Sequence, residues 1–369
     1  MLLDEWHCGT GLEPLGSSRP AAIFSPECHV PGRDRPENTE NDAAGAGIGA
    51  VQSHSHPNPE ELIAGKRILF LVGGPRSGTT WLQLLLSRSS RIATANETHL
   101  FTAYTPSLFS AWEHHQQNVR RLGLHNLMRE DEYFALVKYF VCAVMAKIAE
   151  RNSRAEIILE KTPDHVLYWK SILKTFPEAL FLHVVRDPRS VVASLCAAGA
   201  GWGAQWASRE VLENCETWIK YIKKSQGLKA VSNNFLQVRY EDLWQHGEET
   251  LLSVFSWLGV DVSPQECSQY LSECDIDNLR NNRLTGAPWD LTTEPKDFYR
   301  KGGTETWRDE LTAREVYLIE HLTRELMREF GYAPISMRRK FILPLIMASR
   351  IRTGIAWRLQ ARRANRDNR

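Results

Sequence analysis

The 369-residue sequence lacks several features that identify a protein class directly. It contains no apolar run of about 18 residues, the length that a membrane-spanning helix requires. It does not begin with the charged and then apolar pattern of a secretory signal. From these absences we expect a protein that stays in the cytoplasm.

Cysteine is scarce and net charge is low. The seven cysteines show no CxxC spacing, which predicts free thiols in a reducing compartment. A formal net charge of +1 argues against nucleic acid as the main partner. The 12 histidines include no HExxH motif, so we predict no metal.

The most informative segment that is present is Ile68–Leu82, with the sequence ILFLVGGPRSGTTWL. It predicts a buried strand, a glycine-rich turn and a helix that begins near Thr79. Such a turn directs backbone N–H groups and a helix N-terminus at one point, which suits a phosphate. Gly73 and Gly78 have the spacing of a Walker A loop, but Thr79 stands where that loop has its lysine. With Arg76 inside the loop instead, we expect a nucleotide other than a nucleoside triphosphate.

The run Pro75–Trp81 resembles the 5′-phosphosulfate loop of the sulfotransferases, which use 3′-phosphoadenosine 5′-phosphosulfate (PAPS). The resemblance implies an α/β fold, with a P-loop-type parallel sheet flanked by helices. It also implies that Arg76 lies beside the sulfuryl group and that Trp81 stacks on adenine. The alternative is a generic strand–turn–helix connection. The loop residues implied to contact the donor are Arg76, Ser77, Gly78, Thr79, Thr80 and Trp81.

A second, independent segment begins with the apolar strand Phe181–Val185. Asp187 followed by Pro188 signals the start of a helix. Ser194 comes two helical turns later, on the same face as Asp187. Arg186 and Ser194 can therefore converge on one dianion, and their spacing is similar to the 3′-phosphate site of the sulfotransferases.

Two more segments fit the same family. Leu236–Leu243 resembles a strand that ends in Tyr-Glu-Asp, whose tyrosine approaches the adenine, although Tyr240 can equally be a core residue. Arg300–Arg308 resembles the segment that closes over the 3′-phosphate, and its alternative is a solvated basic turn. From these segments the resemblance adds Tyr240, Arg300, Lys301 and Gly302 to the donor site.

Glu97 is the first candidate for the base that accepts the proton of the acceptor hydroxyl. It follows one helix and a short connection, which places it near the carboxyl ends of the strands, where α/β sheets bind ligands. The segment Ala95–Phe101 resembles the stretch in which carbohydrate and tyrosylprotein sulfotransferases carry a glutamate base. His99 is the alternative, since histidine titrates near neutrality. Proline (Pro163) replaces the histidine of the small-molecule branch after Lys161-Thr, which favours Glu97.

Lys161 ends a predicted strand and precedes a helix entry. There it can neutralise charge on the transferring sulfuryl group, or it can form a salt bridge with Glu160 or Asp164. The helical region between Phe101 and Arg151 builds the acceptor pocket in this family. Trp202 and Trp206 are either part of an acceptor lid or core anchors.

The domain organisation predicted from composition has three parts. Residues 1–62 form an acidic, flexible leader because they contain few recurring apolar residues. A single catalytic domain covers 63–335. The basic tail, 336–369, is either an amphipathic helix on an anionic bilayer, peripheral to the membrane, or a helix packed on the domain.

Together these motifs favour a sulfotransferase that moves a sulfuryl group from PAPS to a hydroxyl of a sugar, lipid or small molecule. The reaction is expected to be an in-line displacement, catalysed by positioning and charge. A P-loop kinase is the second hypothesis, but it needs a Walker lysine or a Mg²⁺-binding acid after the second strand, and neither is evident. The third is a non-catalytic nucleotide-binding module associated with a membrane.

Overall fold

The computed structural model describes residues 58–118 and 123–335. The predicted tail and almost all of the predicted leader lie outside these residues. The last residues of the predicted leader form helix α1 (Pro59–Leu62), which Asn58 caps by accepting a hydrogen bond from the backbone N–H of Glu60.

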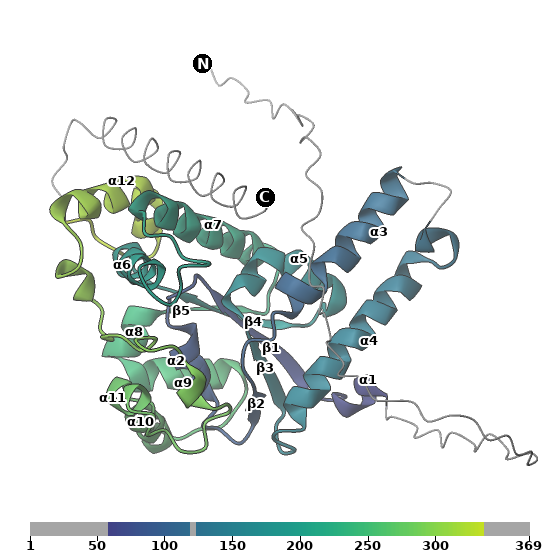
Figure 1. The fold of residues 1–369 in the computed structure, drawn as a ribbon. Helices are drawn as coiled ribbons and strands as arrows, with labels where there is room; N and C mark the ends of the chain where they lie inside the picture. The colour runs from purple at the N-terminus through teal and green to yellow at the C-terminus, as the bar shows by residue number, and fades with distance from the viewer. Residues whose placement is uncertain (1–57, 119–122, 336–369) are drawn as a thin grey trace, which may run out of the picture. The chain divides into compact units, whose positions relative to one another are not determined.

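The described residues form one five-stranded parallel sheet with the order β2-β3-β1-β4-β5 (Figure 1). Every residue of β1 after Arg67 is buried, as expected for a parallel strand covered on both faces. The central position of β1 between β3 and β4 creates a switch point at the carboxyl ends of the strands. The predicted fold class is confirmed. The strands are β1 Arg67–Gly73, β2 Ile92–Thr94, β3 Ile157–Lys161, β4 Leu180–Val185 and β5 Phe235–Arg239.

Helices cover both faces of this sheet, because alternate residues of each strand point to opposite sides. Phe70 and Val72 of β1 pack into a core with α4 and α7, whereas Leu69 and Leu71 pack into a second core with α2 and α9. The remaining helices are α3 Pro106–Asn118, α5 Trp169–Thr175, α6 Pro188–Gly199, α8 Tyr240–Gln245, α10 Pro264–Glu273, α11 Ile276–Arg280 and α12 Ala313–Glu329. The four helices named first are α2 Thr79–Leu86, α4 Glu130–Ala149, α7 Val211–Lys229 and α9 Gly247–Trp257.

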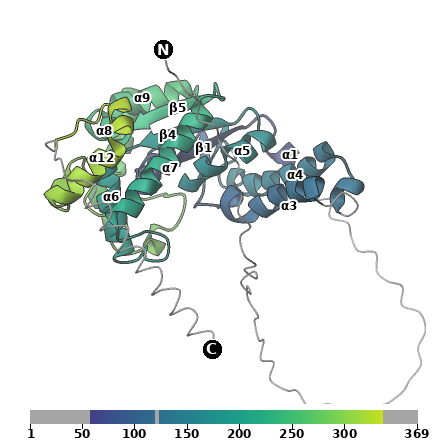
Figure 2. The same cartoon turned by 90° about the horizontal axis from the view of Figure 1, so that it is seen from above.

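Helices α3 and α4 form a hairpin beside the sheet, and both views show them side by side (Figures 1 and 2). The rings of Phe109 and Phe134 stack between them, with centroids 5.1 Å apart. The apolar side of α4 faces the core through Val137, Val141 and Met145. None of the described helices combines the length and apolar character that crossing a bilayer requires. The five described cysteines are unpaired.

Candidate active site

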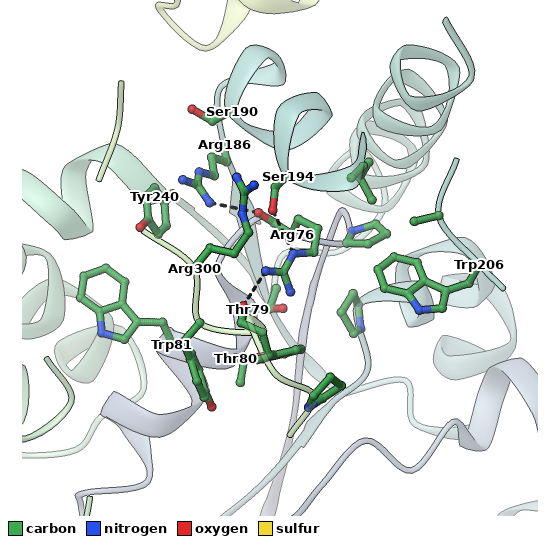
Figure 3. A pocket seen from close by; sticks show the side chains of 18 of the residues that line it. Arg76, Thr79, Thr80, Trp81, Arg186, Ser190, Ser194, Trp206, Tyr240 and Arg300 are labelled. Carbon is green, nitrogen blue, oxygen red and sulfur yellow. Dashed lines mark hydrogen bonds between the residues drawn. The ribbon is translucent and has the colours of Figure 1, made fainter. Parts of the chain in front are cut away.

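A cavity of about 940 Å³ opens at the carboxyl ends of the strands. It brings together the predicted site residues from all the separate sequence segments. Ser77 is the exception, since it is 2% exposed and does not line the cavity. Figure 3 shows the centre of the cavity with ten of its residues labelled. The predicted residues that line it are Arg76, Gly78, Thr79, Thr80, Trp81, Glu97, His99, Lys161, Arg186, Ser194, Tyr240, Arg300, Lys301 and Gly302.

The turn between β1 and α2 requires glycine at two positions, because other groups approach its backbone too closely there for a side chain. A Cβ atom on Gly73 would lie 2.7 Å from the carbonyl oxygen of Val184, and one on Gly78 would lie 2.5 Å from the ring of Tyr240. Gly78 also has a φ of 96°. Arg76 has a φ of 67°, a left-handed conformation that is uncommon outside glycine. Such strain often occurs at functional sites.

The side chain of Arg76 crosses the cavity. Its Nε donates to Ser194 Oγ over 3.0 Å, and its second amino group donates to the carbonyl oxygen of Phe298 over 2.7 Å. Burial is the main cause that lowers the pKa of Arg76, and the charges of Arg186 and Arg300 add to it, bringing the pKa to about 10. The site therefore concentrates positive charge in a place with little solvent.

Arg186 lies between the end of β4 and the start of α6, as predicted. It donates to the carbonyl oxygens of Arg76 (3.2 Å) and Gly303 (2.9 Å), and its guanidinium carbon lies 3.9 Å from the ring centroid of Tyr240. The buried Nε of Arg186 has no hydrogen-bond partner among the described residues. Within the same residues, neither Arg76 nor Arg186 forms an ion pair with a carboxylate. This region of the cavity is thus prepared for an anion.

Three aromatic rings form a cluster beside the glycine turn. The ring of Trp81 lies 5.7 Å from that of Tyr240 and 5.4 Å from that of Trp244. The indole N–H of Trp81 donates to the carbonyl oxygen of Cys274, which fixes the ring. The sequence prediction that Tyr240 ends a strand is wrong, because β5 ends at Arg239 and Tyr240 begins α8. Trp244 was missed, although its position four residues after Tyr240 is one helical turn.

Lys161, Glu97 and His99 meet near the Thr80 side of the turn. Lys161 Nζ lies 2.5 Å from Glu97 Oε1 and donates to Thr80 Oγ1 over 3.1 Å. The alternative that paired Lys161 with Glu160 or Asp164 is wrong, since its carboxylate partner is Glu97. His99 Nε2 lies 3.5 Å from Glu97 Oε2, and the side chain of Glu97 is 33% exposed.

The predicted closing segment also reaches the cavity. Arg300 and Lys301 both form ion pairs with Glu310, at 2.7 Å and 3.1 Å. Gly302 has a φ of 67°, and a Cβ atom there would lie 2.7 Å from the ring of Trp244. The segment therefore rests on the aromatic cluster.

The end of the cavity away from the glycine turn is lined by other residues than those expected from the sequence. The described residues of the region between Phe101 and Arg151 do not line it, because the apolar side of α4 is used in the core. Trp202 and Trp206 line this end instead, with ring centroids 5.4 Å apart, and Trp206 is 51% exposed. They are not core anchors. One face of α7 completes the wall with Glu213, Thr217, Lys220 and Tyr221.

Residues 69–264 match the family model described as "Sulfotransferase family". That stretch is more than half of the chain. The chain belongs to the sulfotransferase family. As a member of this family, it is an enzyme that transfers sulfuryl groups.

Several known proteins are similar to this sulfotransferase. Protein-tyrosine sulfotransferase 2 of Gallus gallus is 27% identical, over 53% of this chain and 52% of its own. Nodulation protein NoeE of Sinorhizobium fredii is 24% identical, over 72% and 66%. The crystal structure of mouse sulfotransferase SULT7A1 complexed with PAP has a TM-score of 0.48 and 16% identity, over 74% and 90%. The chain thus spans about half to two thirds of these two curated relatives.

Proposed function

We propose that this sulfotransferase takes the sulfuryl group from PAPS and transfers it to a hydroxyl acceptor bound beside Trp202 and Trp206. The observation that carries the proposal is the pair of guanidinium groups, Arg76 and Arg186, with no carboxylate partner among the described residues. Charge-assisted hydrogen bonds from arginine to phosphate and sulfate oxygens are strong. An anion at this place would supply the charged acceptor that both side chains lack among the described residues.

The residues present fit PAPS in three respects. The glycine turn and the N-terminus of α2 suit the 5′-phosphosulfate. The orphaned Nε of Arg186, with Ser190 and Ser194 of α6 nearby in the cavity wall, suits a 3′-phosphate. Trp81 and Trp244 offer flat faces for adenine. We assign the donor site to these groups and to the segment Arg300–Gly302.

The fit requires Arg76 to move. The Nε of Arg76 donates to Ser194 Oγ. The proposal, however, places Arg76 at the sulfuryl end of the donor and Ser194 at its 3′-phosphate end. When PAPS binds, Arg76 would release Ser194 Oγ and the carbonyl oxygen of Phe298, and turn to the phosphosulfate. The exchange is favourable because a charged acceptor replaces two neutral ones.

Glu97 is proposed as the base. It takes the proton of the acceptor hydroxyl while the acceptor oxygen bonds to sulfur and the bond from sulfur to the phosphate oxygen breaks. Lys161 and Arg76 stabilise the negative charge on the transferring group and on the leaving phosphate. His99, 3.5 Å from Glu97, is the alternative base.

The acceptor is proposed to be a hydroxyl compound that carries a ring. Trp202 and the half-exposed Trp206 can stack on a ring, while Glu213, Thr217 and Lys220 of α7 offer polar groups on another wall. Such a mixed wall favours a sugar or phenol over a purely apolar lipid. Incubation with radiolabelled PAPS and a cell extract, followed by identification of the labelled product, tests this point.

The donor is tested by thermal shift. Excess 3′-phosphoadenosine 5′-phosphate should raise the melting temperature of the full chain through binding to the folded state. ATP with Mg²⁺ should not, since Thr79 replaces the Walker lysine. Stabilisation by ATP alone would favour the kinase hypothesis. Stabilisation by the bisphosphate without transfer from PAPS to any acceptor would favour the non-catalytic one.

A further inference from the structure

Beneath the base lies a buried network that the reaction scheme above does not use. Its centre is Glu160, which is 1% exposed. Glu160 and Lys161 are neighbours at the end of β3, so their side chains point to opposite faces of the sheet. Lys161 reaches Glu97 in the cavity, whereas Glu160 turns away from it, toward His165 in the helical turn Pro163–Tyr168.

The carboxylate of Glu160 is surrounded by donors. Its Oε1 accepts from the backbone N–H of Thr98 (3.2 Å), from Thr98 Oγ1 (2.8 Å) and from Thr162 Oγ1 (2.7 Å). His165 Nδ1 lies 2.7 Å from its Oε2, and both side chains are fully buried. Burial raises the pKa of Glu160, but its contacts with His165, Thr162 and Thr98 outweigh burial and lower that pKa to about 2.

The network accepts hydrogen bonds from four consecutive backbone N–H groups, those of residues 98–101. The N–H of Thr98 donates to Glu160, and that of His99 donates to Thr162 Oγ1 (3.3 Å). The N–H of Leu100 donates to Thr98 Oγ1 (3.3 Å), and that of Phe101 donates to His165 Nε2 (3.1 Å). These groups belong to the start of a π-helical turn, Leu100–Tyr104, and would otherwise be orphans.

Glu97 comes immediately before this segment, and His99 within it has a φ of 53°. A strained residue persists only where its surroundings hold it. We infer that Glu160 and His165 are positioning residues: they clamp the backbone of residues 98–101 and thereby fix the carboxylate of Glu97 against Lys161. The inference rests on the proposed role of Glu97 as the base. A displacement of about 1 Å can reduce a rate about 100-fold.

The decisive substitution is Glu160→Gln, which keeps the shape and removes one acceptor. Since Nε2 of His165 accepts from Phe101, a neutral ring carries its proton on Nδ1, the atom that lies 2.7 Å from Glu160 Oε2. The amide group of a glutamine would face Nδ1 with its own hydrogens. The ring would then move its proton to Nε2, where it opposes the N–H of Phe101. The substitution Glu160→Gln should therefore break the hydrogen bond between the N–H of Phe101 and His165.

Thr98 supplies a matched pair of variants in case Glu160→Gln does not fold. Thr98→Val deletes the hydroxyl that joins Glu160 to the N–H of Leu100 and keeps the shape of the side chain. Thr98→Ser keeps the hydroxyl. The inference requires the valine variant to be impaired and the serine variant to be close to the parent. A role in packing alone would give the reverse order, because serine lacks the methyl group.

Two readouts are needed on the full chain. Hydrogen exchange should become at least about tenfold faster at the amides of 98–101 in Glu160→Gln and Thr98→Val, but not in the strands. Turnover of labelled PAPS with 4-nitrophenol as the acceptor should fall about 10- to 100-fold, with an unchanged KM for PAPS. Glu150→Gln, at the exposed residue that follows α4, is the control for the charge change.

The outcomes separate the two proposals. The positioning role would be overturned if the amides of 98–101 exchanged at the parental rate in both Glu160→Gln and Thr98→Val. It would also be overturned if exchange became faster while turnover stayed at the parental rate. If instead Glu97→Gln itself leaves turnover intact while the bisphosphate still binds, the base assignment fails and not the clamp. If the bisphosphate does not bind the parent chain, the donor assignment fails, and the exchange measurement still decides whether the clamp exists.

Discussion

Lys161 Nζ lies 2.5 Å from Glu97 Oε1, although the two residues are 64 positions apart in the chain. Lys161 is 3% exposed, so its ammonium group is held inside the fold, whereas Glu97 remains accessible from the cavity. In the proposed mechanism, this one cation serves two partners: Glu97 as the base, and the negative charge that develops on the transferring group.

Lys161→Ala should reduce turnover of PAPS by about 100-fold or more, the effect of removing one group that stabilises transition-state charge. Binding of 3′-phosphoadenosine 5′-phosphate should weaken much less, because that product lacks the sulfuryl group. Steady-state kinetics and calorimetry measure the two effects. Lys147→Ala, on the exposed side of α4, is the control. An equal loss in binding and turnover would make Lys161 a general anion ligand.

Glu97→Gln should bind the bisphosphate like the parent and turn over about 10²- to 10⁴-fold more slowly, the usual contribution of a general base. The side chain keeps its shape, so the fold and the donor site are unaffected. His99→Asn in parallel should change the rate only a few-fold. The opposite ranking of these two variants would assign the base to His99.

Arg186→Ala should weaken binding of the bisphosphate by about 10- to 100-fold, since hydrogen bonds to charged groups contribute about 1.5–3 kcal/mol. Adenosine 5′-phosphate, which has no 3′-phosphate, should be bound equally by parent and variant. Titration calorimetry with both ligands gives the comparison, and Arg129→Ala on the surface is the control. A loss of affinity for both ligands would place Arg186 elsewhere on the nucleotide.

Arg76→Gln should stabilise the ligand-free protein, by about 2 °C in melting temperature if the gain is near 1 kcal/mol. Burial, Arg186 and Arg300 lower the pKa of Arg76 to about 10, below its value in an unfolded chain. Folding therefore favours loss of this proton, and the contribution of Arg76 to stability rises with pH only in the alkaline range above about 10. At neutral pH the charged form costs stability.

The same variant should lose the stabilisation that the parent gains from PAPS, because the missing charge is what the donor needs. A differential scanning experiment with and without ligand shows both effects. A lower melting temperature for the ligand-free variant would mean that the hydrogen bonds to Ser194 and Phe298 outweigh the buried charge.

Local signals in the sequence predicted the sheet, and the segments that the proposal assigns to the donor line one cavity. The turn at Gly73–Gly78, the cap at Asp187 and the strand end at Lys161 each arise from neighbours in the chain, and the structure has all three. Parallel strands then bring their ends together whatever the details of packing. That is why segments more than a hundred residues apart share one cavity.

The parts that failed depend on long-range packing. The family resemblance gave the acceptor pocket to the region between Phe101 and Arg151, but the apolar side of α4 packs into the core and the described residues of that region do not line the cavity. Spacing alone does not distinguish the buried Glu160 from a solvated glutamate beside Lys161. Phe298, which covers Arg76, comes from an irregular segment without a pattern.

Gly78 lies where the glycine turn meets the aromatic cluster. Its α-carbon lies against the ring of Tyr240. The glycine turn that suits a phosphate and the aromatic cluster that suits adenine therefore have no free space between them. A methyl group at this single position would push the aromatic cluster and the turn apart at once. A side chain at position 78 would therefore disturb both parts of the proposed nucleotide site with a single change.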